Sequence, residues 1–334
     1  METNHNMSNE ESLKMEQFEI EERANRIDEI YVAHTSAHRA VAGIEDCLRR
    51  SLTAAEPLNA VLIGRAGTGK TTVCNAVLQH LPRRIDVREG KEVTVIPAFY
   101  SEIPSPATIR GVASSLLGAL GDVHPDRGTA INLTHRVITQ LKACETRLIL
   151  LDEFQHLLDE KRSRREEYRQ DVSNWVKTLI NKTHVPVVLV GMPECEVLVD
   201  ADPQLARRFQ RRFRLENLGF GGKEKGEFRL FVEALGAAIP EYCNLAGFPD
   251  LSSKTEALAL YAASGGNPSY ATGLLKETVI VTLRTRRETT TMEDFAAAYD
   301  IGVSQGGSLV KVNPFRLSQE DLVRNIKNGF RGVN

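Results

Sequence analysis

Short apolar runs alternate with helical apolar stripes along the first two thirds of the chain. The runs predict strands over 60–63, 93–100, 148–151, 185–190 and 213–218. Apolar residues at i, i+3 and i+4 spacing predict helices between them, over 38–51, 107–120 and 172–180. Pro97 places the second strand at an edge or a bulge. Alternating strands and helices indicate an α/β fold, with a mostly parallel sheet between two helical layers.

The pattern changes after residue 222, since no strand is evident from there on. Helical spacing predicts a small all-helical domain, with helices over 228–235, 255–264, 270–283 and 292–299. Residues 1–25 are polar and charged, which predicts a flexible N-terminal arm, with a candidate helix near 13–20. The expected organisation is therefore an arm over 1–25, an α/β domain over 26–222, a helical domain over 223–302 and a tail over 303–334.

A phosphate-binding pattern, G-x-x-x-x-G-K-[ST], covers residues 64–71 between the first strand and a helix. Its glycines let the backbone turn its N–H groups toward an anion, and the helix N-terminus adds partial positive charge. Lys70 would reach the β- and γ-phosphates, and the Thr71 hydroxyl would bind Mg²⁺. The expected nucleotide-binding residues are Gly64, Arg65, Ala66, Gly67, Thr68, Gly69, Lys70, Thr71 and Thr72. The alternative is a glycine-rich turn without a ligand.

Two carboxylates, Asp152 and Glu153, end the apolar strand over 148–151. Ligands of doubly wound sheets bind at the carboxyl ends of strands. Asp152 would hold Mg²⁺ through water and thus belong to the nucleotide site, and Glu153 would act as the general base toward the attacking water. The alternative is a strand that runs into a solvated turn.

The net charge of -2 excludes a chain that is basic throughout, so any nucleic-acid surface must be a local patch. The five cysteines are scattered without a C-x-x-C pair, which indicates reduced thiols and a cytoplasmic location. Neither a signal peptide nor an apolar run near 18 residues is evident, so we expect no membrane partner.

Together these motifs resemble AAA+ ATPases, with a P-loop NTPase domain over 26–222 and a helical lid over 223–302. The chain is more narrowly similar to the TniB/TnsC branch, which regulates DNA transposition with ATP. The features that carry this resemblance, besides the helix before the phosphate loop, are Leu150–Phe154, Leu189–Glu194, Gln204–Phe209 and Asn313–Phe315. Similar cores occur in AAA+ helpers of replication initiation and in secretion or assembly ATPases. A small-molecule kinase fits poorly, because such kinases rarely carry a separate helical lid.

The resemblance implies an ATP site, with Mg²⁺, that an arginine from a neighbouring subunit completes. Arg207 and Arg208 are the candidates for this catalytic arginine, and Arg211 and Arg212 follow closely. These arginines are alternatively surface cations or DNA contacts. Tyr31 and Val32 lie where the family holds adenine, or are ordinary core residues.

The resemblance also implies a homo-oligomeric ring or helical filament around double-stranded DNA, which contacts the phosphate backbone. Candidate DNA-binding residues are Arg110, Arg127, Thr129, Lys161, Arg162, Arg164 and Arg165. The last four alternatively form a solvated helix start beside Glu160, Glu166 and Glu167. The implied partners are a transposase and a target-selecting protein or CRISPR-type complex. The tail would dock the transposase or pack on the lid.

Two positions depart from the family pattern. Gly191 and Met192 follow the strand over 185–190, where a polar side chain is usual. Ser269 stands in the stretch Gly266–Asn267–Pro268–Ser269, where an arginine is usual. These departures predict ATP hydrolysis that is slow or depends on a partner.

Overall fold

Alternate residues of the central strands face two different helical layers. The structure is a computed structural model and describes residues 9–32, 34–105, 107–158, 166–222, 224–303 and 305–331. These residues form two units, one over Thr35–Glu216 and one that joins the residues up to His34 to those from Asn217 onward. The first unit is the α/β unit and the second is the helical unit.

A parallel five-stranded sheet forms the centre of the α/β unit, in the order β4-β5-β6-β1-β7. The strands are β1 (Ala60–Gly64), β4 (Ala98–Glu102), β5 (Leu148–Asp152), β6 (Val187–Gly191) and β7 (Arg211–Leu215). The helices are α2 (Thr35–Ser51), α3 (Lys70–His80), α4 (Ile109–Ala119), α5 (Ala130–Ala143), η2 (Phe154–Leu158), α7 (Glu166–Thr183), α8 (Glu194–Ala201) and α9 (Pro203–Arg208). The predicted α/β fold class is confirmed.

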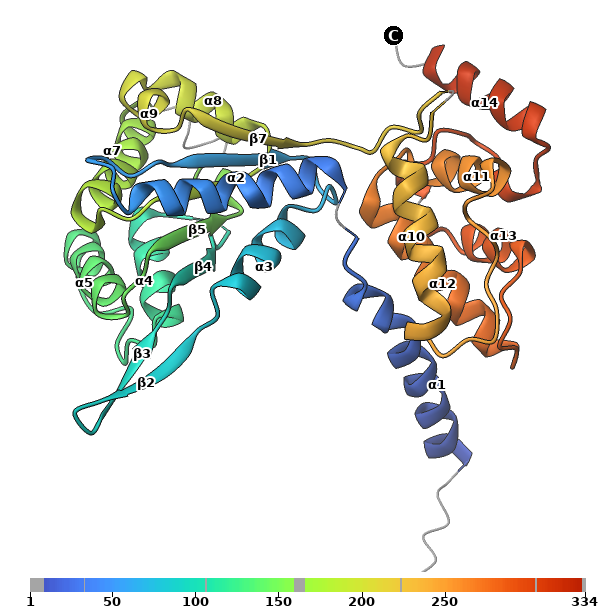
Figure 1. The fold of residues 1–334 in the computed structure, drawn as a ribbon, viewed down its shortest axis with the longest axis horizontal. Coiled ribbons are helices and arrows are strands. Elements are labelled where there is room, and N and C mark those ends of the chain that lie inside the picture. The colour runs from blue at the N-terminus through green and yellow to red at the C-terminus, as the bar shows by residue number, and fades with distance from the viewer. Residues whose placement is uncertain are drawn as a thin grey trace, which may run out of the picture. The chain divides into compact units, whose positions relative to one another are not determined.

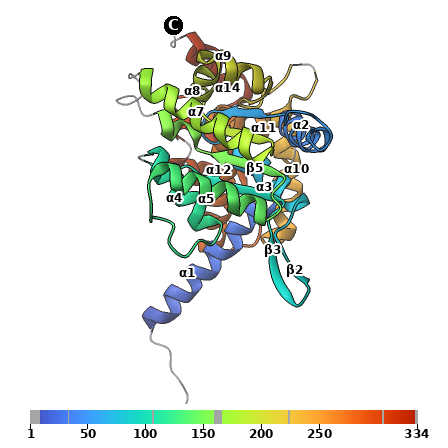
Figure 2. The same cartoon turned by 90° about the vertical axis from the view of Figure 1, so that its left-hand side faces the viewer.

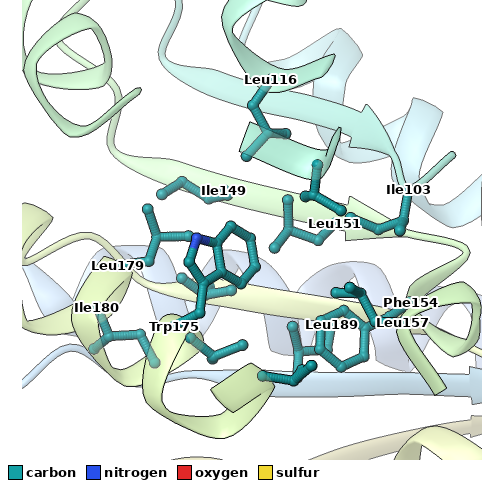
Figure 3. Packing of buried hydrophobic residues seen from close by; sticks show 14 of the residues in the cluster. Ile103, Leu116, Ile149, Leu151, Phe154, Leu157, Trp175, Leu179, Ile180 and Leu189 are labelled. Atoms are coloured by element: carbon teal, nitrogen blue, oxygen red, sulfur yellow. The ribbon is translucent and has the colours of Figure 1, made fainter. Parts of the chain in front are cut away.

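The two faces of the sheet bury separate apolar clusters. Val61 and Ile63 of β1 pack with α4, α5, α7 and α8, while Ala60 and Leu62 pack with α2 and α3. Successive side chains of a strand point to opposite faces, so a sheet covered on both sides needs unbroken apolar strands. Figures 1 and 2 show the resulting three layers. In Figure 3, Trp175 and Leu179 of α7 and Phe154 and Leu157 of η2 fill the layer over β5 and β6.

The strand predicted over 93–100 is two strands in two sheets. β2 (Arg84–Arg88) and β3 (Lys91–Val95) form an antiparallel hairpin that extends away from the main sheet (Figure 1). β4 begins after Pro97 and is an edge strand of the main sheet. An edge position was one of the two alternatives predicted from Pro97, the other being a bulge. Pro97 has no N–H, and its carbonyl accepts hydrogen bonds from the backbone N–H groups of Arg147 and Leu148. Pairing therefore changes partner at this proline.

The helical unit contains the predicted lid helices and more. Its elements are α1 (Asn9–Asn25), η1 (Arg26–Glu29), α10 (Glu227–Tyr242), α11 (Lys254–Ser264), α12 (Pro268–Arg284), α13 (Met292–Asp300), η3 (Gln305–Gly307), η4 (Pro314–Arg316) and α14 (Gln319–Arg331). They surround an apolar core to which Phe228, Leu274 and Phe295 contribute fully buried side chains.

The predicted N-terminal boundaries need correction. The helix α1 includes the candidate helix near 13–20 but extends through most of the segment expected to be a flexible arm. Arg23 Nε donates a hydrogen bond to the Cys243 carbonyl at 3.1 Å. Ala24 and Ile27 are buried in the core of the helical unit, and Asp28 pairs with Lys276 of α12. Residues 26–34 therefore belong to the helical unit and not to the α/β domain, because their apolar side chains are buried there.

The described tail also packs in the helical unit, as one of its two predicted alternatives stated. The Asn313 amide donates hydrogen bonds at 2.8 Å to the Ala296 carbonyl and to Asp300 Oδ1. The rings of Phe315 and Phe295 lie 5.4 Å apart. Docking of a transposase to this tail stays a prediction.

Candidate active site

The loop between β1 and α3 has the conformation that its glycines predict. Gly67 and Gly69 have φ angles of 75° and 95°, a region that residues with a Cβ rarely adopt. A Cβ on Gly64 would lie 2.3 Å from Thr68 Oγ1 and 2.8 Å from the Leu215 carbonyl oxygen. Thr68 Oγ1 donates a hydrogen bond to the Arg65 carbonyl at 2.8 Å, which stabilises the loop conformation. The glycines thus serve both a tight turn and close packing of the loop.

Lys70 is positioned under this loop at the start of α3. Its side chain is buried, and Nζ donates to the carbonyls of Gly64 at 2.9 Å and Arg65 at 3.2 Å. Gly69 caps α3 without a side-chain hydrogen bond, so the first N–H groups of the helix keep their capacity to bind an anion. A buried ammonium and a helix N-terminus in one loop fit a phosphate ligand.

Asp152 joins the loop to the end of β5. It is 1% exposed, and its Oδ2 accepts hydrogen bonds from Thr71 Oγ1 at 3.4 Å and from the Tyr100 hydroxyl at 2.9 Å. Burial and the neighbouring Asp152 carboxylate raise the pKa of Tyr100, which keeps its hydroxyl a donor. A carboxylate beside a hydroxyl fits Mg²⁺, a cation that prefers oxygen and keeps water and substrate phosphates as its other ligands.

Glu153 lies at the turn that leaves the sheet. Its φ of 55° is unusual for a residue with a side chain, and its backbone N–H donates to Asp152 Oδ1 at 2.7 Å. The carboxylate is 38% exposed, accepts a hydrogen bond from the Gln155 amide and lies 3.7 Å from His156 Nε2. A partly exposed carboxylate beside the buried Asp152 can take a proton from a water molecule.

The arginines near α9 fall into two groups. Arg211 pairs with Asp46 at 2.6 Å, and Arg212 pairs with Glu196 at 2.9 Å and with Asp200. The side chain of Arg207 is 70% exposed and lies 4.0 Å from Glu56, while Arg208 donates to Asn181 at 3.3 Å. The ion pairs hold Arg211 and Arg212 within the unit, so Arg207 and Arg208 are better placed to reach another molecule.

Two of the candidate DNA contacts, Arg110 and Thr129, have structural roles within the chain. Arg110 donates to the backbone carbonyls of Asp126 and Gly128 at 2.7 Å and 3.2 Å, and Thr129 caps α5. Arg127 is exposed in the same loop. The cluster Lys161, Arg162, Arg164 and Arg165 lies outside the described residues.

Tyr31 and Val32 belong to the helical unit, whereas the phosphate loop belongs to the α/β unit. Val32 packs against the core of the helical unit, and Tyr31 is 51% exposed. Their contact with adenine stays a prediction.

A family model described as bacterial TniB protein matches residues 23–217, which is more than half of the chain. The chain belongs to the TniB family. This match confirms the TniB branch of AAA+ proteins that the resemblance in the sequence implied, and the phosphate loop and the parallel sheet agree with it.

Other proteins share the AAA+ architecture of this TniB family member. The ORC1 protein of Aeropyrum pernix, solved in complex with DNA, is 21% identical with a TM-score of 0.56, over 81% of this chain and 66% of that one. The ORC2 protein of the same organism, in ADPNP and ADP complexes, is 15% identical with a TM-score of 0.61, over 83% and 70%. The chaperone ClpB of Bacillus cereus is 25% identical over 57% of this chain. The chain spans about a fifth of the length of the curated relatives that it matches.

Sequence reasoning missed two residues at the site of this TniB family chain, Tyr100 and Gln155. Each contacts a carboxylate from a position that no phosphate-loop motif covers. Gln155 stands two residues after Glu153, so a polar residue this close to the carboxylates was the available signal.

Among the described residues, no helix combines the length and apolar character needed to cross a bilayer.

Proposed function

We propose that this chain is an ATPase that assembles on double-stranded DNA and delivers a target site to a transposase. The observation that carries the proposal is the phosphate loop with Lys70, set against Asp152 and Glu153, in a chain of the TniB family. The cytoplasm, where transposition targets lie, is the compartment that fits this role.

In the proposed reaction, the phosphate loop and Lys70 bind the phosphates of ATP. Thr71 and Asp152 would hold Mg²⁺, which would supply positive charge beside those phosphates. Tyr100 fixes Asp152 through its hydroxyl group. Glu153 accepts the proton of the attacking water, and the developing charge is stabilised by an arginine of the next subunit.

The reaction is expected to be slow without a partner. β6 ends in Gly191, and Ser269 at the start of α12 is short and uncharged, so neither position supplies a charged side chain to the phosphates. We expect a turnover of the isolated chain below the range of about 1–10³ s⁻¹ that is typical of enzymes.

Alanine at Arg207 is expected to lower ATP hydrolysis by about 10³-fold or more if this arginine acts in trans. Mixing Arg207→Ala with Lys70→Ala subunits should restore part of the rate, because one variant supplies the arginine and the other the intact loop. Arg214→Ala is the matched control, since Arg214 is exposed and pairs with Glu196 in its own unit. If both Arg207→Ala and Arg208→Ala hydrolysed ATP at the wild-type rate, neither arginine would take part in the reaction.

DNA binding is expected to depend on the nucleotide. Negative-stain electron microscopy of the protein on duplex DNA should show rings or filaments with ATP or a slowly hydrolysed analogue, and none with ADP. Binding should weaken steeply with salt, since phosphate contacts release counterions. A protein that stays monomeric and does not bind DNA with ATP, with the analogue or with ADP would contradict the proposal.

The second candidate is an AAA+ helper of replication initiation. The ORC1 neighbour, which was solved with DNA, favours this class among the alternatives. Both functions predict DNA binding with ATP, so the test must involve the partner. Stimulation of strand transfer by the cognate transposase would favour the transposition role, and its absence would favour the replication role.

A further inference from the structure

Gln155 lies between the candidate base and the neighbouring strand. Its Nε2 donates a hydrogen bond to Glu153 Oε2, and its Oε1 accepts one at 3.0 Å from the backbone N–H of Met192, just after β6. Phe154 and Leu157, on either side in the chain, are fully buried and anchor η2 over the sheet (Figure 3). The Gln155 side chain therefore links the residue after β5 to the residue after β6, from a short helix that is packed on the sheet.

The contacts determine the orientation of the amide. The Met192 N–H can only donate, so it must meet Oε1. The Cys195 thiol lies 3.8 Å from the same oxygen, and burial raises the pKa of Cys195 to about 12, so the thiol stays protonated and also donates. The NH₂ group is consequently turned toward the Glu153 carboxylate, which can only accept.

Gly191 makes room for this arrangement. A Cβ at Gly191 would lie 2.4 Å from Gln155 Oε1 and 2.6 Å from Cys195 Sγ. The φ of Gly191 is not in the left-handed region, so the backbone conformation does not require a glycine. The requirement comes from the space that Gln155 occupies at the end of β6.

We propose that Gln155 is a positioning residue for Glu153, which it holds to the end of β6 in a geometry suited to proton transfer. This inference rests on the proposed ATPase reaction. Gln155 leaves Oε1 of Glu153 to meet water while it restrains Oε2. Its loss should reduce the rate of the chemical step and leave nucleotide binding unchanged, because its hydrogen bonds go to Glu153, Met192 and Cys195, which lie outside the phosphate loop.

The test measures steady-state ATP hydrolysis and nucleotide affinity of the full chain. Gln155→Ala should lower kcat by about 10-fold or more, the effect of one hydrogen bond to a charged group, and should change KM and nucleotide affinity less than twofold. Gln155→Asn, which is too short to span both contacts, should not restore the rate. Gln170→Ala is the matched control, because this exposed glutamine of α7 donates a hydrogen bond to Asn174 on the same helix.

A double-mutant cycle separates positioning from a loss of folding. Gly191→Ala should lower kcat by displacing Gln155, and it should cost much less in the Gln155→Ala background, since that clash is then absent. The contact of the new Cβ with Cys195 persists in both backgrounds and cancels from the comparison. Thermal unfolding of each variant shows whether the fold survives.

The outcomes distinguish this inference from the proposed function. If the wild type hydrolyses ATP and Glu153→Gln does not, the proposed reaction stands. A folded Gln155→Ala protein with wild-type kcat, or effects of Gln155→Ala and Gly191→Ala that add, would then overturn the positioning role alone. A wild-type chain that hydrolyses no ATP with DNA and transposase present would overturn both.

Discussion

Alanine at Lys70 is expected to abolish nucleotide binding and, with it, assembly on DNA. The ammonium group of Lys70 is buried, and it donates hydrogen bonds to the loop carbonyls of Gly64 and Arg65. Removing one partner of a buried charge pair costs about 2–5 kcal/mol, so ATP affinity should fall by about 30-fold or more. Calorimetric titration with ATP and its slowly hydrolysed analogue measures the loss directly.

Lys182→Ala provides the comparison for that experiment. Lys182 is an exposed lysine in the last turn of α7, and its removal should leave ATP affinity unchanged. Thermal unfolding should show that Lys70→Ala still folds, since the loop keeps its glycines and Thr68. Nucleotide affinity equal to that of the wild type in Lys70→Ala would mean that the loop is a turn without a ligand.

Glutamine at Glu153 is expected to separate binding from hydrolysis. The amide has nearly the shape of the carboxylate, so the phosphate loop, Lys70 and Asp152 should bind ATP as before. An amide does not accept the proton of water, and general bases contribute about 10²–10⁴-fold to a rate. Phosphate release should therefore fall by that factor, and filaments formed on DNA with ATP should persist.

The control for Glu153→Gln is Glu145→Gln. Glu145 has nearly the same backbone conformation, with φ at 53°, but it pairs on the surface with Arg88 of the hairpin. Its replacement should leave phosphate release unchanged. Normal hydrolysis by Glu153→Gln would show that another group is the base, and the roles of Gln155 and Asp152 would then need reassignment.

Secondary structure was predictable where one local pattern decided it. β1, β5 and β6 are buried apolar runs, and their predicted bounds agree with the structure within a few residues. The helix α8 that follows β6 was not predicted. The hairpin of β2 and β3 was missed because Ile85 and Val87 are mostly exposed and bury no face. The division at the N-terminus was wrong because Ala24 and Ile27 are buried against residues from Leu218 onward, far away in the sequence.

The candidate site was predictable to the extent that it is contiguous in sequence. The phosphate loop uses eight consecutive residues, and its glycine conformations follow from the turn itself. Asp152 and Glu153 were assigned because the strand before them is buried and ends at the ligand-binding edge of the sheet. The sequence by itself thus determined where the phosphate loop and the two carboxylates lie, and it predicted a nucleotide site there.

Only the tertiary structure decided which residues support those groups. Tyr100 reaches Asp152 because β4 pairs with β5, and Gln155 reaches the end of β6 because β5 pairs with β6. The same structure divides the arginines, since Asp46 and Glu196 hold Arg211 and Arg212. The physical reason is that strand order follows from burying both faces of the sheet at once, a property of the whole unit that no local spacing records.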